Sequence, residues 1–331
     1  MFKGLAALAA AALAGGTARG AERTVLVTND DGLTANVVAL YEALTAAGYD
    51  VIVSVPCSDQ SGMGAALQIA RPLTPLAGPC RHGAAKAGAP AAGPMTRTDI
   101  PEGAFFYVEG TPVMALLYGL DVLAPVRWGR DPDLVLSGPN EGHNVGSLVL
   151  SSGTVANAQA AALRGLPAIA FSAGARTEGD PAEIGDASAR VATLALSLVD
   201  ALADAADDGP LLPAGVALNV NFPDQLEGAA WRPSRIGTYQ AYEVTFVKSV
   251  AASAPAIMRE AAAARGFELP DLPGLSFAPN EAEPHADQRS DEAVVYRTNI
   301  AVSPMQTGYA LRGELPPGLR AALRRLSSEA R

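Results

Sequence analysis

The sequence predicts an α/β fold, a doubly wound and mostly parallel sheet with a C-terminal hairpin extension. Short runs of β-branched and apolar residues alternate with longer segments of helical periodicity between residues 24 and 222. Most of these runs end in polar, glycine-containing loops, as strands do before a crossover helix. Because ligands bind beyond the carboxyl ends of the strands in such sheets, we expect a functional site in those loops.

The first strand, helix and strand set the pattern. Residues 24–28 have the composition and length of a strand buried on both faces, and they end in a polar turn at residues 29–32. Apolar residues then recur at helical spacing over residues 33–44, and Gly48 is a natural C-terminal cap. Residues 51–56 form the next predicted strand. This opening implies parallel strands joined by a right-handed crossover.

The same alternation continues along the chain. Further strands are predicted at residues 105–108, 133–138, 168–172, 215–222 and 294–302, and further helices at residues 113–123, 154–164 and 187–206. Aromatic and β-branched residues between 239 and 246 predict hairpin-like strands. We expect residues 21–331 to form one domain, with a core over about 23–222 and a hairpin and tail over about 235–331.

Two stretches rich in Ala, Gly and Pro interrupt the pattern, at residues 72–101 and near residues 251–284. We interpret both as surface excursions and expect the first to carry no active group. Cys57 and Cys80 are 23 residues apart and fit either one disulfide or two buried thiols. Neither belongs to a CxxC pattern, so redox catalysis is disfavoured.

The composition is that of a globular protein, and it excludes some classes of function. Of the 331 residues, 49% are hydrophobic, which is enough for a large core. The formal net charge of -10 argues against a nucleic-acid polymer as the main partner, because neutralising phosphates requires a basic surplus. Three histidines largely exclude a multi-histidine metal centre, so we expect any metal site among oxygen ligands.

The first 20 residues have the pattern of an export signal. Lys3 gives a positive start, residues 5–13 are an unbroken Leu/Ala run, and small residues follow at 15–21. The apolar run is shorter than the roughly 20 residues that a membrane-spanning helix needs. We therefore expect a cleaved signal peptide at residues 1–20, no membrane anchor, and a periplasmic or secreted protein that is cytoplasmic if the leader is not cleaved.

Asp30 and Asp31 are adjacent carboxylates at the end of a buried strand. Their charges repel unless a cation or a basic group lies between them. A hard divalent ion is the simplest solution, because carboxylate oxygens are its preferred ligands. A simple turn and helix cap explains the same two residues equally well.

Two further loops at the same predicted edge carry polar groups. Ser61 follows the second strand and offers a hydroxyl, although such loops are usually only polar. After the strand at 133–138, Asn140 offers a carbonyl oxygen to a hard cation, and Asn144 offers an amide to an anionic oxygen. Asparagines and glycines in left-handed turns are the alternative explanation of that loop.

The tripeptide Ser152-Gly153-Thr154 begins a predicted helix. Free backbone N–H groups and the helix dipole favour a phosphate there, and an N-cap that serves only its own helix is the alternative. A parallel sheet gathers all of these loops on one edge. Oxygen ligands beside an anion site together suggest metal-assisted hydrolysis of a phosphate ester.

The polar strings in these loops resemble, in order and spacing, those of the SurE family of 5′/3′-nucleotidases. The strings are Val27-Thr28-Asn29-Asp30-Asp31-Gly32, Gln60-Ser61-Gly62-Met63-Gly64, Glu109-Gly110-Thr111-Pro112, Ser137-Gly138-Pro139-Asn140-Glu141-Gly142-His143-Asn144-Val145-Gly146 and Ser152-Gly153-Thr154-Val155. The resemblance covers about residues 23–172. Later, Ser290-Asp291 and Val302-Ser303-Pro304-Met305 look like the closing segment of the family.

This resemblance implies a Rossmann-like core and an enzyme that removes phosphate from nucleoside monophosphates, using one divalent metal ion per subunit, Mg²⁺ or Mn²⁺. It also implies a projecting hairpin used in assembly, and hence a homo-oligomer, a dimer or a tetramer. By position, the residues similar to the metal ligands are Asp30, Asp31, Ser61 and Asn140, and those similar to phosphate contacts are Asn144, Ser152, Gly153 and Thr154. Asp30 is then the carboxylate expected to orient or deprotonate the attacking water.

Other interpretations are a non-catalytic, exported solute- or anion-binding protein and a phosphatase of broader ester specificity. Paired aspartates argue against a simple anion binder unless a cation is present. Arg81-His82-Gly83 matches a short motif of histidine phosphatases, but no predicted strand precedes it. We interpret His143 as an exposed loop histidine rather than a proton donor. No GxGxxG follows the first strand, which disfavours a dinucleotide-dependent oxidoreductase.

Overall fold

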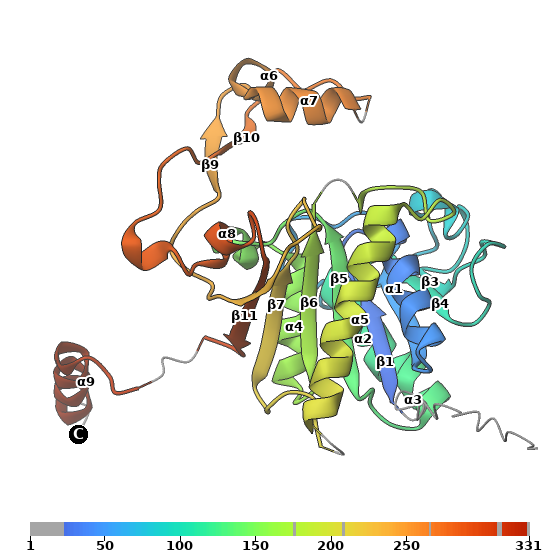
Figure 1. The fold of residues 1–331 in the computed structure, drawn as a ribbon, viewed down its shortest axis with the longest axis horizontal. Helices are drawn as coiled ribbons and strands as arrows, with labels where there is room; N and C mark the ends of the chain where they lie inside the picture. The colour runs from blue at the N-terminus through green and yellow to red at the C-terminus, as the bar shows by residue number, and fades with distance from the viewer. Residues whose placement is uncertain (1–22, 175–176, 207–208, 265, 310–312, 330–331) are drawn as a thin grey trace, which may run out of the picture.

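The computed structural model has a central sheet with helices on both faces (Figure 1). It describes the whole chain except residues 1–22, 175–176, 207–208, 265, 310–312 and 330–331. The leader expected at residues 1–20 therefore lies outside the described residues. Among the described residues, no helix combines the length and apolarity needed to cross a bilayer.

The central sheet confirms the predicted α/β fold. Its strands are β1 (Thr24–Thr28), β2 (Asp50–Pro56), β3 (Ala92–Pro94), β4 (Phe105–Val108), β5 (Leu134–Glu141), β6 (Ala168–Ala173), β7 (Val216–Asn221), β8 (Trp231–Pro233) and β11 (Ile300–Gln306). Within the described part of the chain they run in the order β3-β4-β2-β1-β5-β6-β7-β11-β8. The pairs β3–β4 and β7–β11 are antiparallel, and all other neighbours are parallel.

Helices cover both faces of the sheet (Figure 1). On one face lie α1 (Ala35–Ala46) and α5 (Asp186–Ala206), and on the other α2 (Pro112–Tyr118), α3 (Ala124–Trp128) and α4 (Gly153–Leu163). Strand β1 is entirely buried because it lies in the middle of the sheet under both layers. The helix predicted at 113–123 is broken by a π-type turn over Gly119–Leu123. Pro125 lacks the N–H that would continue regular hydrogen bonding there.

A two-stranded ribbon projects from the body and confirms the predicted hairpin (Figure 1). It pairs β9 (Tyr242–Val247) with β10 (Gly274–Pro279), and α6 (Val250–Ser253) and α7 (Ala256–Ala264) lie at its tip. Strand β10 and both short helices fall in the stretch near 251–284 that we expected to be an irregular excursion. Val250, Ala254 and Met258, in or next to these helices, form a small apolar cluster that packs against Val247 of β9.

The strand expected at 294–302 is wrong in its first half. Residues Glu292–Val295 form helix α8, and β11 begins only at Ile300. The buried carboxylate of Asp291 accepts hydrogen bonds from the backbone N–H groups of Thr238 and Tyr239, at 2.9 and 3.0 Å. These contacts hold the chain in a turn, so the β-branched residues that follow do not extend. The last helix, α9 (Pro317–Glu329), lies away from the body (Figure 1).

The two cysteines form a disulfide, which decides between the alternatives left open by the sequence. Cys57 directly follows β2, Cys80 lies in the Ala/Gly/Pro-rich stretch, and their Cα atoms are 4.7 Å apart. Both residues are buried in the main core. The disulfide therefore fastens the first third of the 72–101 stretch to the carboxyl edge of the sheet.

Candidate functional site

The turn after β1 is closed by hydrogen bonds and presents two carboxylates at the carboxyl edge of the sheet. The Asn29 side chain closes it, donating to the Gly32 carbonyl at 2.7 Å and accepting from the Gly32 N–H at 3.1 Å. Gly32 has a φ of +85°, a conformation that favours glycine. Thr34 then caps α1. Asp30 and Asp31 are thus held adjacent, and each is only 3% exposed.

Asp30 is held by the first turn of α4. The Thr154 hydroxyl donates to Asp30 Oδ1, and it also lies 3.0 Å from the carbonyl oxygen Oδ1 of Asn140. A Cβ atom on Gly153 would lie 2.6 Å from the Asp30 Cβ, so only glycine permits this approach. Burial raises the pKa of Asp30, while hydrogen bonds from Thr154 and the Gly153 N–H act in the opposite direction. The helix start predicted to cradle phosphate therefore contacts a carboxylate directly.

Asp31 is fastened to the end of β5. Its Oδ2 accepts a hydrogen bond from the Glu141 N–H at 3.0 Å. Burial raises the pKa of Asp31 well above its usual range, and the negative charges of Asp30 and Glu141 add to this effect. Among the described residues, Asp31 Oδ2 accepts from the Glu141 N–H and Asp30 Oδ1 accepts from the Thr154 hydroxyl. The charge of Arg81 lowers the pKa of Asp31, but its guanidinium donates to the Asp31 backbone carbonyl rather than to the carboxylate. The two carboxylates therefore form a pocket of negative charge that favours an added cation.

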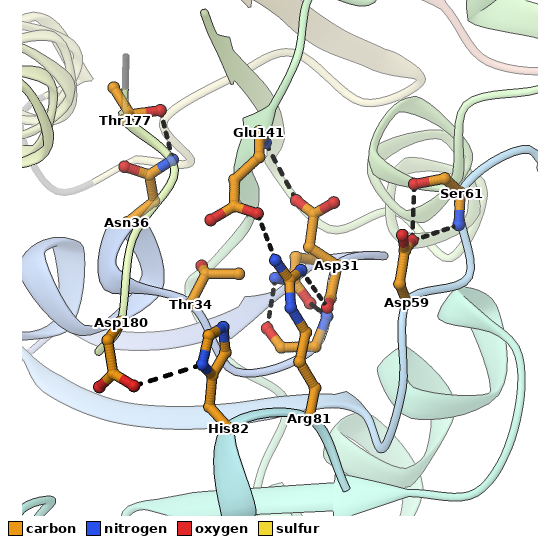
Figure 2. Close-up of polar contacts among 12 residues, drawn as sticks. Asp31, Thr34, Asn36, Asp59, Ser61, Arg81, His82, Glu141, Thr177 and Asp180 are labelled. Atoms are coloured by element: carbon orange, nitrogen blue, oxygen red, sulfur yellow. Dashed lines mark hydrogen bonds and ion pairs between the residues drawn. The ribbon is translucent and has the colours of Figure 1, made fainter. Parts of the chain in front are cut away.

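Arg81, in the stretch 72–101 that was expected to carry no active group, reaches the edge of the candidate site. Its backbone N–H donates to the Cys57 carbonyl at 2.8 Å, next to the disulfide. Its guanidinium donates to the Asp31 carbonyl at 2.8 Å and to Glu141 Oε2 at 2.6 Å (Figure 2). Neither Arg81 nor Glu141 was expected at the site from the sequence. The available signal was the need of two adjacent carboxylates for a basic neighbour.

Ser61 lies near the turn but does not face its carboxylates. Figure 2 shows Ser61 turned toward Asp59, whose Oδ1 accepts from the Ser61 hydroxyl at 2.6 Å and from its N–H at 2.8 Å. The loop itself is tied to the turn, because the Gln60 N–H donates to the Asp30 carbonyl at 2.8 Å. The charge of Asp59 helps to raise the pKa of Asp30. Asp59 was not among the residues expected at the site.

Asn140 is brought to the aspartates. Its Nδ2 donates to the Gly142 carbonyl at 2.8 Å, which leaves its Oδ1 directed toward Thr154 beside Asp30. Ser152 serves as the N-cap of α4, where its Oγ accepts from the Val155 N–H at 3.1 Å. The structure thus brings Asn140, Thr154 and Asp30 together, and it shows that Ser152 caps the helix α4.

Asn144 belongs to a neighbouring polar network. Its Nδ2 donates to Ser172 Oγ at 2.9 Å, and its carbonyl accepts from the side chains of Asn219 and Asn221 at 2.9 and 3.1 Å. The residue is buried. The side-chain amide of Asn144 thus bonds the end of β6 and its backbone bonds β7, and these contacts fix the β5 exit loop.

The two histidines considered from the sequence, His143 and His82, lie in different surroundings. The His143 side chain is 7% exposed, its Nε2 lies 2.8 Å from the Phe222 carbonyl, and its ring lies 4.5 Å from that of Tyr296. The expectation of an exposed loop histidine is therefore wrong, because the β5 exit loop folds onto β7. Burial lowers the pKa of His143. His82 lies in a short 3-10 turn, with Nδ1 3.5 Å from Asp180 (Figure 2).

The donor set fits a hard cation. It consists of two buried carboxylates and the amide oxygen of Asn140, which suit Mg²⁺ or Mn²⁺ better than a soft metal. Among the described residues, no group of three or more His, Cys, Asp or Glu side chains is placed to hold a metal. A cation here would therefore be completed by neutral oxygens and by water or substrate.

The fold and the site define a doubly wound α/β protein with a buried acidic pair at the carboxyl edge of its sheet. The profile of the family described as Survival protein SurE matches residues 25–243. The chain belongs to this family, as its motifs predicted.

Curated relatives carry two kinds of name. An "Acid phosphatase" of Yarrowia lipolytica is 37% identical over 207 residues, which is 60% of this chain and 56% of the relative. A "5'-nucleotidase SurE" of Lawsonia intracellularis is 33% identical over 202 residues, 60% of this chain and 65% of the relative. The match thus spans less than two thirds of the length of these relatives. The SurE protein of Aquifex aeolicus shares the fold, with a TM-score of 0.61, 24% identity and coverage of 92% of this chain and 99% of the other.

Proposed function

We propose that the protein is a metal-dependent phosphomonoesterase that hydrolyses nucleoside 5′- and 3′-monophosphates to nucleoside and phosphate, a 5′-nucleotidase. The observation that carries the proposal is the buried, adjacent pair Asp30 and Asp31, which contacts the first turn of α4 and lies beside the oxygen of Asn140. A buried acidic pair without a bonded cationic side chain is costly unless an added cation completes it. The names of the curated relatives support the same chemistry.

Asp30, Asp31 and Asn140 would hold one Mg²⁺ or Mn²⁺ per subunit, and Ser61 would join them after turning from Asp59. When bound, such an ion lowers the pKa of a water and polarises a phosphoryl oxygen. The Asp30 carboxylate, fixed by Thr154, orients the attacking water and accepts its proton. The remaining phosphoryl oxygens face the start of α4, where the helix dipole favours negative charge. Asn144 keeps the β5 exit loop in place and offers its amide to the same oxygens.

A phosphatase of broader ester specificity is the second candidate, and the relative named acid phosphatase favours it. Both candidates use the same acidic pair and differ only in the part of the substrate beyond the phosphate. A non-catalytic anion-binding protein is disfavoured, because two carboxylates beside an anion weaken its binding.

The test is an assay of phosphate release with a panel of phosphate esters and each divalent ion in turn. We expect turnover of nucleoside monophosphates with Mg²⁺ or Mn²⁺ and none in excess EDTA, with recovery when the ion is restored. Turnover that persists in EDTA would disprove the metal mechanism. The absence of turnover with every ester and ion, together with anion binding, would favour the non-catalytic alternative.

We also propose that the protein is exported and that it forms a dimer or a tetramer. The Cys57–Cys80 disulfide supports export, because disulfides persist in oxidising compartments. The ribbon supports assembly, because Phe246 and Leu275 are largely exposed on it and an isolated two-stranded ribbon is marginally stable. Sequencing of the mature amino terminus and analytical ultracentrifugation test the two proposals.

A further inference from the structure

A polar cavity lies beside the candidate site. Its volume is about 140 Å³, and the residues that line it include Gln60, Gln68, Arg71, Thr74, Glu109 and Gly110. They come from two segments, the loop that follows β2 and the loop that follows β4. Both loops belong to the carboxyl edge of the sheet that carries the acidic pair.

The cavity is tied to the acidic pair by backbone contacts. Gln60, which lines the cavity, donates its backbone N–H to the Asp30 carbonyl at 2.8 Å. At the far end, the Thr111 hydroxyl donates to the Ala66 carbonyl at 2.6 Å and fastens the first loop to the second. Hydrogen bonds therefore fix the two loops that form the cavity at this edge of the sheet.

The position of the cavity suits a group attached to the phosphate through a sugar. Strand β4 is the second neighbour of β1, since the order is β4-β2-β1. Adjacent strands are about 4.8 Å apart, so the ends of β4 and β1 are separated by roughly 10 Å. A ribose between a phosphate at Asp30 and a base in the cavity spans a comparable distance.

The chemistry of the lining suits a nucleobase. Arg71 donates hydrogen bonds, Glu109 accepts them, and the amides of Gln60 and Gln68 do both. The edge of a base likewise combines donors with acceptors, and Arg, Glu and Gln are the side chains that read such edges. A second phosphate would be repelled by Glu109, and an apolar group would leave the charged side chains without partners.

We infer that this cavity binds the nucleobase of a nucleoside monophosphate and that Arg71 and Glu109 determine the preference for nucleotides over other phosphate esters. The inference rests on the proposed function, because it places the phosphate at the acidic pair. Arg71 and Glu109 are exposed, so substitutions there do not disturb the core.

The experiment compares a nucleoside 5′-monophosphate panel with ribose 5-phosphate, which has the same phosphate and sugar without a base. The measured quantity is the ratio of the two kcat/KM values, for the wild type, Arg71→Gln and Glu109→Gln. Arg164→Ala is the matched control, since Arg164 pairs with Asp121 on the surface at the other end of α4.

We expect the wild type to prefer nucleotides, and each cavity variant to lower the ratio by at least about fivefold, mainly through KM. The control should keep the wild-type ratio. Equal hydrolysis of both esters by the wild type, or a parallel loss of both in the variants, would overturn the inference and leave the proposed phosphatase intact. Hydrolysis of neither ester would overturn the proposed function together with the inference.

Discussion

The Asp30-Asp31 turn is held from two sides by different means. The inner side consists of the β5 exit loop and the start of α4, residues 140–154, which contact the turn through Thr154, Asn140 and Glu141. The outer side is the segment 57–81, which is irregular and reaches the turn through Arg81. Regular elements place the inner contacts, whereas a covalent bond places the outer one. Packing on one side and a disulfide on the other thus both hold the Asp30-Asp31 turn in position.

The largest effect is expected from removing one carboxylate of the acidic pair with Asp30→Asn. Turnover should fall by about 10²- to 10³-fold, which corresponds to roughly 3 to 4 kcal/mol of transition-state stabilisation. The folded state should be at least as stable, because burial raises the pKa of Asp30 and the amide carries no charge. Steady-state kinetics and thermal melting measure the two effects. Asp121→Asn, a surface control, should change neither, and full activity of Asp30→Asn would contradict the assignment.

The outer side depends on the disulfide. Replacing both cysteines, as Cys57→Ser with Cys80→Ser, should lower the free energy of unfolding by about 3 kcal/mol, as expected for a loop of this length. Urea denaturation with and without a reductant measures the change. The wild type should lose the same stability in the reductant, and the double variant should not respond to it. A reductant-insensitive wild type would show that the disulfide does not stabilise this segment.

The inner side is held in part by a titratable carboxyl group, that of Glu292, which bonds the β5 exit loop. Glu292 accepts hydrogen bonds from the Gly146 N–H at 3.0 Å and from Ser303 at 2.9 Å, and burial raises its pKa to about 7. Between pH 4.5 and about 7 the folded protein binds more protons at Glu292 than the unfolded chain. The stability contributed by this group therefore falls as the pH rises through that window.

Glu292→Gln isolates this effect, because the amide remains neutral. Relative to the wild type, the variant should gain about 2 to 3 kcal/mol as the pH rises from 4.5 to 7. Urea denaturation at several pH values measures the difference. A difference that does not vary with pH would show that Glu292 titrates in its ordinary range.

The smallest effect concerns the contact of Arg81 with Glu141. Arg81→Ala should cost about 1 to 2 kcal/mol of stability, less than for a fully buried pair because the Arg81 side chain is 28% exposed. The double variant with Glu141→Gln should recover part of the loss, because no unpaired charge remains. Arg164→Ala, whose ion pair lies on the surface, should cost under about 1 kcal/mol. Equal losses for Arg81→Ala and Arg164→Ala would contradict a specific role for Arg81.

The inner side was predictable from the sequence. Residues 24–28, 105–108 and 168–172 were expected as strands, and the structure has strands at nearly the same positions. Parallel strands bring their carboxyl ends to one edge, so Asp30, Asn140 and Thr154 were expected together and do meet there. Hydrophobic periodicity and turn residues determine strands, helices and turns over a few neighbouring residues, so these elements can be predicted from the sequence.

The outer side was not predictable in the same way. The position of Arg81 follows from a disulfide between residues that are 23 positions apart in the chain. The segment around Arg81 has no helical or strand periodicity from which its structure could be predicted. The orientation of Ser61 was not predictable either, since the Asp59 carboxylate accepts hydrogen bonds from both its hydroxyl and its N–H. Helix α8 was missed because Asp291 takes its partners from a loop more than 50 residues away.

The close approach of Gly153 to Asp30 makes helix and carboxylate one rigid unit. A methyl group at position 153 would meet Asp30 and Pro112 at 2.6 Å, so even alanine requires one of them to move. Substitutions are therefore restricted at the first turn of α4 and tolerated at its other end. Leu163, at its other end, is exposed and open to change, whereas its first turn transmits any displacement of the helix directly to the acidic pair.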